Sequence, residues 1–315
     1  MERTLPGDAG DMQQQGRGTS ASVVAGVDGS PGSRQALRWA GRLARVLGAE
    51  VVVVHAVGLL EEHHAPGTTA ADRRAELRRL VEDEWCAPLS AAECPHRIEV
   101  VDGSAVDVLL GAADRWAAAL VVTGCRGVGD NTALALGSTS LKLLQATRLP
   151  VLVVPDAATA PEPTGSGGLG TIVVGVDGSA PARAALDLGT DLAVAAGGSL
   201  VAVEVLEAVP TFPLGPTATE SSAGEEGVAE RAGGYLDEQA AAVRRRGVPV
   251  RTVVRRGEAA ATLLAVADEV AAALVVVGTR GRGGPDELLL GSVARTVADR
   301  ARRPTLVVPQ PARSG

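Results

Sequence analysis

The sequence predicts an α/β protein made of two tandem, doubly wound domains, each built on a five-stranded parallel sheet. Three observations predict this fold. The chain repeats itself at a spacing near half its length, each copy alternates apolar β-branched runs with Ala/Leu-rich segments, and each copy ends one of those runs in a glycine-rich loop. Strands that are apolar throughout and separated by helices are typical of parallel sheets covered on both faces.

The repeat extends well beyond one motif. VVAGVDGSPGSRQALRWA aligns with IVVGVDGSAPARAALDLG, LVVTGCRG with LVVVGTRG, and LPVLVVP with RPTLVVP. The later matches are more widely spaced than the first, so the second copy carries one insertion. We expect this insertion in PTFPLGPTATESSAGEEG, whose composition predicts a longer loop.

The elements of copy one follow from its residue periodicity. Its expected strands are SVVAGV, EVVVVHAV, RIEVV, ALVVTG and PVLVVP. Helical spacing predicts a helix after the first strand and another after the third, from Ala36, Leu37, Ala40, Leu43, Ala44 and Leu47, and from Val106, Leu109, Leu110 and Ala113. We predict a disordered tail at 1–20, copy one at 21–155, a flexible linker at 156–170, copy two at 171–309 and a tail at 310–315.

Composition excludes several classes of function. The chain has a formal net charge of -7 and 2% aromatic residues, which argues against binding of nucleic acid through a basic or stacking surface. No apolar run is long enough to span a bilayer, and the N-terminus lacks the apolar core of an export signal. Three cysteines cannot pair evenly, which favours a reducing compartment. We therefore expect a cytoplasmic protein that binds neither nucleic acid nor membrane.

The glycine loops are the most informative feature. After the fourth strand, copy one reads GCRGVGDNTALALGS and copy two reads GTRGRGGPDELLLGS, with the three glycines and the final serine at identical spacing. Glycines allow close approach of a ligand to the backbone. The last Gly-Ser opens a helix, whose free N–H groups and dipole favour an anion such as phosphate. A P-loop is excluded because no GK[ST] follows, and GVDGSPG does not fit a dinucleotide fingerprint.

Gly-x2-Gly-x9-Gly-Ser after the fourth strand, a Val-Asp turn after the first and a closing VLVVP strand together resemble the ATP-binding branch of the universal stress protein family, in its tandem form. The resemblance covers about residues 20–155 and 171–309. It implies the strand order 3-2-1-4-5 of the adenine nucleotide alpha hydrolase-like fold, with ligand at the switch point between the first and fourth strands.

The resemblance also implies two nucleotide sites. The adenine-facing acid corresponds to Asp28 and Asp177, and the backbone contact to adenine falls on Ala56 and Val205. The whole set implied for nucleotide binding is Gly26, Asp28, Ala56, Gly124, Arg126, Gly127, Gly137, Ser138, Thr139 and Ser140 in copy one, and Gly175, Asp177, Val205, Gly278, Arg280, Gly281, Gly291, Ser292 and Val293 in copy two.

Copy two departs from the family pattern, because Ala294 stands where Ser140 supplies a hydroxyl in copy one. Charges inside the loops also differ, with Asp130 in copy one and Arg282, Asp286 and Glu287 in copy two. These differences do not rank the two sites.

Other residues are set aside. The spacings of His55, His63, His64, Cys86, Cys94 and His96 match no compact zinc pair, so no metal site is predicted. Cys125 lies in the first glycine loop, but Thr279 is its counterpart, and a small filler residue is the favoured interpretation. Trp39, Trp85 and Trp116 are expected to serve in packing.

The leading hypothesis is a regulatory protein that binds ATP, with or without Mg²⁺, turns over little or none of it, and acts through ligand-dependent conformation or association with an unknown protein partner. Alternatives are an enzyme that hydrolyses ATP or transfers a group from it, and a scaffold without nucleotide. The fifth strands, VLVV and TLVV, are plausible sheet edges. We expect them to pair and make the chain an intrachain pseudo-dimer; further homodimerisation is left open.

Overall fold

The computed structural model describes residues 21–58, 69–127, 136–156, 168–207, 218–281 and 290–310. The predicted tail at 1–20 and most of the predicted linker and C-terminal tail lie outside these ranges. Within them the two copies form one ten-stranded sheet, in the order β3-β2-β1-β4-β5-β10-β9-β6-β7-β8. The strand order 3-2-1-4-5 is thus confirmed in both copies, and copy two has it when its half of the sheet is read from β8 to β10.

The elements alternate along the chain as expected. Copy one consists of β1 (Ser22–Gly26), α1 (Pro31–Leu47), β2 (Glu50–Val57), α2 (Ala70–Leu80), the π-helical turn η1 (Val81–Trp85), α3 (Ala87–Ser90), β3 (His96–Asp102), α4 (Ala105–Arg115), β4 (Ala118–Gly124), α5 (Ser138–Ala146) and β5 (Val151–Val154). Copy two consists of β6 (Thr171–Gly175), α6 (Ala180–Ala196), β7 (Ser199–Leu206), α7 (Ala218–Arg245), β8 (Val250–Arg256), α8 (Ala259–Glu269), β9 (Leu274–Gly278), α9 (Ser292–Arg300) and β10 (Thr305–Val308).

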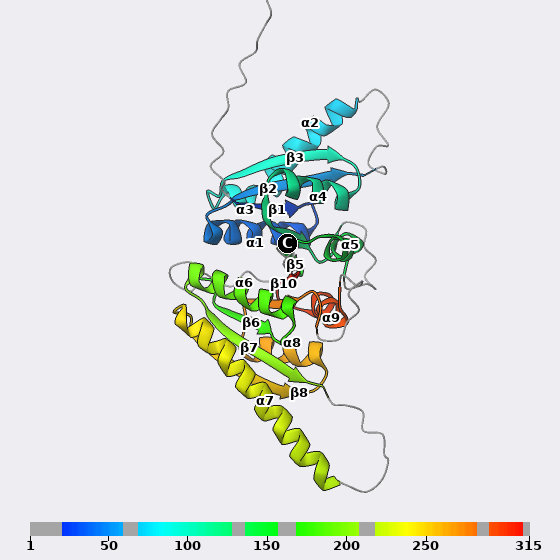
Figure 1. The fold of residues 1–315 in the computed structure, drawn as a ribbon. Coiled ribbons are helices and arrows are strands. Elements are labelled where there is room, and N and C mark those ends of the chain that lie inside the picture. The colour runs from blue at the N-terminus through cyan, green and yellow to red at the C-terminus, as the bar shows by residue number, and fades with distance from the viewer. Residues whose placement is uncertain are drawn as a thin grey trace, which may run out of the picture.

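The sheet is buried on both faces, which is why its strands are apolar throughout. Along β2, Val51 and Val53 belong to one core cluster, whereas Val52 and Val54 belong to another on the opposite face. Helices α1, α6 and α7 cover the first face, and α4, α5, α8 and α9 cover the second (Figure 1). This alternation with period two is what a strand buried on both sides requires.

The two copies join through their last strands, as predicted. β5 and β10 pair antiparallel, with Val151 opposite Val307 and Val153 opposite Thr305. Figure 1 shows copy one above copy two with these strands meeting between them. The core clusters also continue across the junction, since Cys125 and Leu144 of copy one share a cluster with Val297 of copy two.

The prediction of a long loop in copy two is wrong in part. Helix α7 begins at Ala218, inside the stretch predicted to be a loop, and continues to Arg245. Its counterpart in copy one is divided into α2, η1 and α3. The extra residues therefore lengthen a helix, and the part of the predicted loop at 210–217 lies outside the described residues. Among the helices that the structure describes, none has the length and apolar character needed to cross a membrane.

Candidate functional site

In each copy the predicted site residues meet at the carboxyl ends of the first and fourth strands. β1 lies between β2 and β4, and β6 lies between β7 and β9. The chain leaves these neighbouring strands toward opposite faces of the sheet, and open α/β sheets bind ligands at such a switch point. The Asp turn follows the first strand of each pair, and the glycine loop follows the other.

The repeated GVDGS forms the same turn twice. Asp28 Oδ1 accepts the N–H of Ser30 at 3.0 Å, and Asp177 Oδ1 accepts that of Ser179 at 2.9 Å. The glycine after each acid has a positive φ, 80° at Gly29 and 79° at Gly178, which strains other residues. Each serine then caps its helix, because the side chain of Ser30 accepts from Ser33 and that of Ser179 from Ala182. The motif therefore has a structural reason as well as a functional one.

The first two glycines of each loop have close neighbours. A Cβ on Gly124 would lie 3.0 Å from the backbone carbon of Gly32, and one on Gly278 would lie 2.6 Å from that of Pro181. Because the first glycine has no side chain, α1 can begin in contact with β4, and α6 can begin in contact with β9.

The second glycine faces the acid of the Asp turn. A Cβ on Gly127 would lie 2.5 Å from Asp28 Oδ2, and one on Gly281 would lie 2.5 Å from Asp177 Oδ2. The repeated acid and the repeated glycine loop are thus in contact in both copies.

The third glycine closes the loop and opens a helix. The N–H of Gly137 donates to Cys125 O at 2.7 Å, and that of Gly291 donates to Thr279 O at 2.6 Å. Both glycines are helix N-caps without a side-chain hydrogen bond, whereas side-chain oxygens cap α1, α2, α4, α6 and α8. Within the described residues, no side chain therefore caps the first N–H groups of α5 and α9, and this arrangement suits an anion.

Copy two contains a cavity of about 640 Å³ at this position. That volume lies within the range of roughly 300–1,000 Å³ that is typical of small-molecule sites. Its lining includes nine of the predicted site residues, namely Gly175, Asp177, Val205, Gly278, Arg280, Gly281, Gly291, Ser292 and Val293. All the site residues predicted in copy two thus come together around one space.

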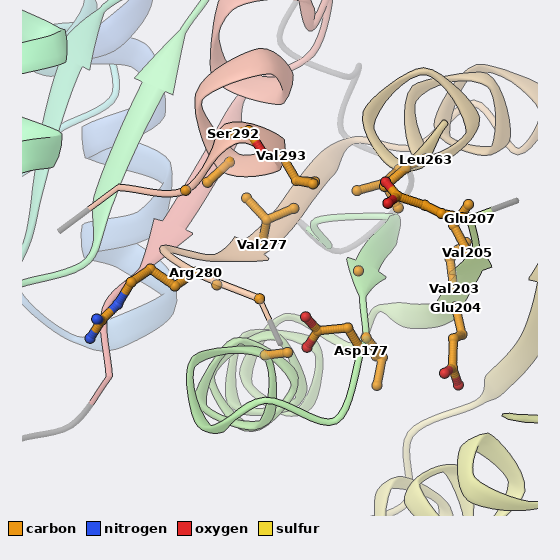
Figure 2. A pocket seen from close by; sticks show the side chains of 18 of the residues that line it. Asp177, Val203, Glu204, Val205, Glu207, Leu263, Val277, Arg280, Ser292 and Val293 are labelled. Carbon is orange, nitrogen blue, oxygen red and sulfur yellow. The ribbon is translucent and has the colours of Figure 1, made fainter. Parts of the chain in front are cut away.

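The cavity has an apolar wall and several charged residues at its border. Figure 2 shows Val203, Val205 and Leu263 on the β7 and α8 side, and Ser292 and Val293 at the start of α9. Asp177 lies between them, and the side chain of Arg280 extends away from the group (Figure 2). The carboxylates of Glu204 and Glu207 come from β7 and the residue after it.

Eleven lining residues were absent from the predicted set, among them Glu204, Glu207, Leu263 and Leu290. Glu204 had a sequence signal, because an acid within the apolar run LVAVEVL is unusual for a buried strand. It is 6% exposed. Leu263 and Leu290 line the cavity through the packing of α8 and of the loop end, which the sequence pattern does not reveal.

The position of Glu204 is held by His55 in copy one. His55 is buried, its Nδ1 lies 2.9 Å from Val27 O, and its ring meets that of Trp85 edge-on at 5.2 Å between centroids. A Cβ on Gly29 would lie 2.5 Å from the Trp85 ring, so this tryptophan packs beneath the Asp28 turn. The packing role predicted for Trp85 is confirmed, and His55 belongs to the same contact.

The predicted hydroxyl of Ser140 is present but engaged within the protein. Ser140 is 2% exposed and its Oγ donates to Gly124 O at 2.8 Å, with Thr123 Oγ1 3.4 Å away. In copy two the corresponding residues are Ala294 and Val277, which line the cavity. A polar pair in one copy is therefore an apolar pair in the other.

The remaining predicted residues of copy one lie at the same edge. Gly26 ends β1 and Ala56 lies near the end of β2, while Ser138 and Thr139 form the first turn of α5. Arg126 Nε lies 3.6 Å from Asp156 Oδ2, so the arginine expected to serve phosphate faces a carboxylate. In the ranges that the structure describes, no group of three or more His, Cys, Asp and Glu residues is placed to hold a metal ion; His63 and His64 lie outside those ranges.

Cys125 begins the glycine loop of copy one and is buried. Burial raises the pKa of its thiol to about 11; nearby Arg126 opposes this rise, and the carboxylates of Asp156 and Asp299 add to it. A thiol held in its protonated form is a poor nucleophile. This favours the filler role predicted for Cys125.

Comparison with known proteins agrees with this geometry. The model of the universal stress protein family matches residues 21–155 and 168–309. Universal stress protein Rv2623 of Mycobacterium tuberculosis is 33% identical over 302 residues, which cover 92% of this chain and 96% of that protein. A universal stress protein of Mycolicibacterium smegmatis is 32% identical over 303 residues, with 92% and 97% covered.

Among solved structures, a universal stress protein from Archaeoglobus fulgidus DSM 4304 aligns with a TM-score of 0.63 at 20% identity, over 92% of this chain and 98% of that one. At this identity the likeness concerns the fold alone. The family model and the relatives, which extend over most of the chain, go further: the chain belongs to the universal stress protein family and carries its domain twice.

Proposed function

We propose that this chain is a regulatory protein that binds adenine nucleotide, above all ATP, at the glycine loops of its two copies. The observation that carries the proposal is the cavity of copy two, where the Asp177 turn, the glycine loop and the uncapped start of α9 surround one space. The nucleotide signals a state of the cell by changing the conformation or association of the chain.

The cavity supports a definite orientation of the ligand. The base would lie against the apolar residues Val203, Val205 and Leu263, with Asp177 beside it to accept from an amino group. The phosphates would lie at Gly291, Ser292 and Val293, where the N–H groups of the first turn of α9 can donate to them. Bound Mg²⁺ would reduce the charge of the phosphates, and it would travel with the ATP.

A binding measurement tests this proposal. The full chain is denatured directly after purification, released nucleotide is identified by mass spectrometry, and ATP and ADP are titrated into emptied protein by calorimetry. We expect binding at micromolar or tighter affinity, and protein that neither carries nor binds these nucleotides would refute the proposal.

Two matched variants locate the phosphate. Ser292→Asp places a negative charge in the first turn of α9, where it stabilises a helix but repels phosphate. Ala261→Asp places the same charge in the first turn of α8, at a residue outside the cavity lining. We expect Ser292→Asp to weaken ATP binding at copy two about tenfold or more, while Ala261→Asp leaves it unchanged. Equal effects would contradict the assigned orientation.

We also propose that the chain turns over little or no ATP. Phosphate release under single-turnover conditions measures this directly. Release faster than about one per minute that Gly291→Ala abolishes would favour the alternative of an ATP-hydrolysing enzyme, since this dividing line lies well below the rates of typical enzymes.

A further inference from the structure

The glycine loops of the two copies have different charges beside them. In copy one Asp156 follows β5 and its carboxylate lies 3.6 Å from the guanidinium of Arg126. The same carboxylate lies against the start of α1, since a Cβ on Gly32 would be 2.3 Å from Asp156 Oδ1. A negative charge therefore already occupies the neighbourhood of the loop that is proposed to bind phosphate.

A second carboxylate reaches this loop from copy two. Asp299 lies in the last turn of α9, and Val297 and Ala298 of that helix share a core cluster with Cys125 of the copy-one loop. The electrostatic effect of Asp299 on the thiol of Cys125 agrees with this proximity. Two carboxylates from different parts of the chain thus lie beside the same loop.

Copy two has neutral residues at the equivalent places. Its closing TLVV strand is followed by Pro309 and Gln310, which align with Pro155 and Asp156 of copy one. Gln145 of α5 likewise aligns with Asp299 of α9. The acids of copy two lie instead at the end of β7, as Glu204 and Glu207, where copy one has His55 and Gly58. The copies therefore differ in where negative charge lies relative to the glycine loop.

We propose, resting on the function proposed above, that the two sites select nucleotides by phosphate number: copy two binds the triphosphate, and copy one binds an adenine nucleotide with fewer phosphates. Asp156 and Asp299 are the residues that set this difference. Each added phosphate increases the ligand's negative charge near these carboxylates, and the repulsion acts over about the 8 Å Debye length of physiological salt.

The experiment measures AMP, ADP and ATP affinity at each site separately, in the full chain without Mg²⁺. Ser292→Asp disables copy two and Ser138→Asp disables copy one, each by an acid in a helix first turn. With copy one alone, we expect ATP to bind no more tightly than AMP. With copy two alone, we expect ATP to bind about tenfold or more tightly than AMP.

A charge exchange identifies the residues. In the Ser292→Asp chain, Asp156→Asn with Asp299→Asn should strengthen ATP binding about tenfold and leave AMP binding within about threefold. In the Ser138→Asp chain, Gln310→Asp with Gln145→Asp should weaken ATP binding by a similar factor. Circular dichroism checks that each variant folds. Asp299→Asn should not destabilise α9, because it removes an acid from a helix C-terminus, where an acid is unfavourable.

The outcomes separate the two proposals. If neither site binds any adenine nucleotide, the proposed function itself fails. If both sites bind and the ratio of ATP to AMP affinity is the same in each, the proposed function stands and the selection by phosphate number is wrong. If the ratios differ but the exchanges of Asp156 and Asp299 leave them unchanged, these residues do not set the selection, and the inference is overturned.

Discussion

Copy one and copy two share the backbone of the site and differ in the side chains around it. In both copies the Asp turn accepts the same N–H, the second glycine faces the acid and the third glycine donates across the loop. In contrast, His55 becomes Glu204, Ser140 becomes Ala294 and Asp156 becomes Gln310. The comparison teaches that glycine and backbone geometry define where a ligand can bind, while the surrounding side chains are free to diverge and set what binds.

The largest difference in stability concerns the core under the first helix. Trp39 is fully buried in copy one, and its counterpart in copy two is the partly buried Leu188. We expect Trp39→Ala to cost about 3–5 kcal/mol and Leu188→Ala about 2 kcal/mol, because a larger cavity remains after the tryptophan is removed. Urea unfolding followed by far-ultraviolet circular dichroism measures both costs, since the helices and strands of both copies contribute to this signal. Equal losses of stability for Trp39→Ala and Leu188→Ala would show that the two copies do not differ at this position.

The first glycines of the loops should differ in their tolerance of a methyl group. Gly124 lies against the backbone at the start of α1, and Gly278 against the backbone at the start of α6. A Cβ would be closer to that backbone at Gly278, 2.6 Å, than at Gly124, 3.0 Å. We expect Gly278→Ala to destabilise the chain by about 2–3 kcal/mol and Gly124→Ala by about 1–2 kcal/mol, since backbone cannot move aside as a side chain can. Thermal unfolding by calorimetry measures both, and the reverse order would show that copy one is the tighter of the two.

The serine of copy one should matter to folding, and its introduction into copy two should not. Ser140→Ala removes a hydrogen bond to the buried Gly124 carbonyl and is expected to cost about 1 kcal/mol. Ala294→Ser is expected to change stability by less than about 0.5 kcal/mol, because its hydroxyl would border the cavity. Chemical denaturation of the two variants checks this. An Ala294→Ser variant that is less stable than Ser140→Ala would contradict it.

Alkaline pH should weaken copy one selectively, because all three cysteines lie there. Burial raises the pKa of Cys86 and Cys125 to about 11 and also raises that of Cys94. As the pH rises, the thiols of the unfolded chain therefore ionise before those of the folded chain. What the buried thiols contribute to the free energy of unfolding is fully present below the ordinary thiol pKa of 9.0, and it is lost as the pH rises toward 11.

The midpoint of urea unfolding by tryptophan fluorescence should accordingly fall between pH 8.5 and 10.5, by about 1 M. A variant with alanine at all three cysteines serves as the control and should show a smaller fall. An equal fall in the two proteins would assign the effect to other groups.

The fold could be predicted to this extent because its determinants are local or repeated. Apolar runs such as EVVVVHAV define buried strands, and the family resemblance supplied their order. The glycines and Asp28 and Asp177 could be placed for the same reason, since loop spacing is preserved in both copies. The error in α7 arose because the glycines and serines of ATESSAGEEG suggested a turn, whereas this segment is helical in the folded chain.

The features that could not be predicted depend on contacts between distant segments. The proximity of Asp299 to the loop of Cys125 exists only because β5 pairs with β10. The edge contact of Trp85 with His55 likewise depends on how η1 packs against β2. No periodicity or spacing in either segment points to these partners, since they follow from tertiary packing.

The junction of β5 with β10 has a consequence for self-association. Two separate five-stranded sheets would expose four edges, and an exposed edge is a template on which strands of other molecules can add. Joining the copies leaves β3 and β8 as the outer strands. Charged side chains line both, with Arg97, Glu99 and Asp102 on β3 and Arg251, Arg255 and Arg256 on β8. Adding a foreign strand there would desolvate these charges, so the fused sheet resists growth into aggregates.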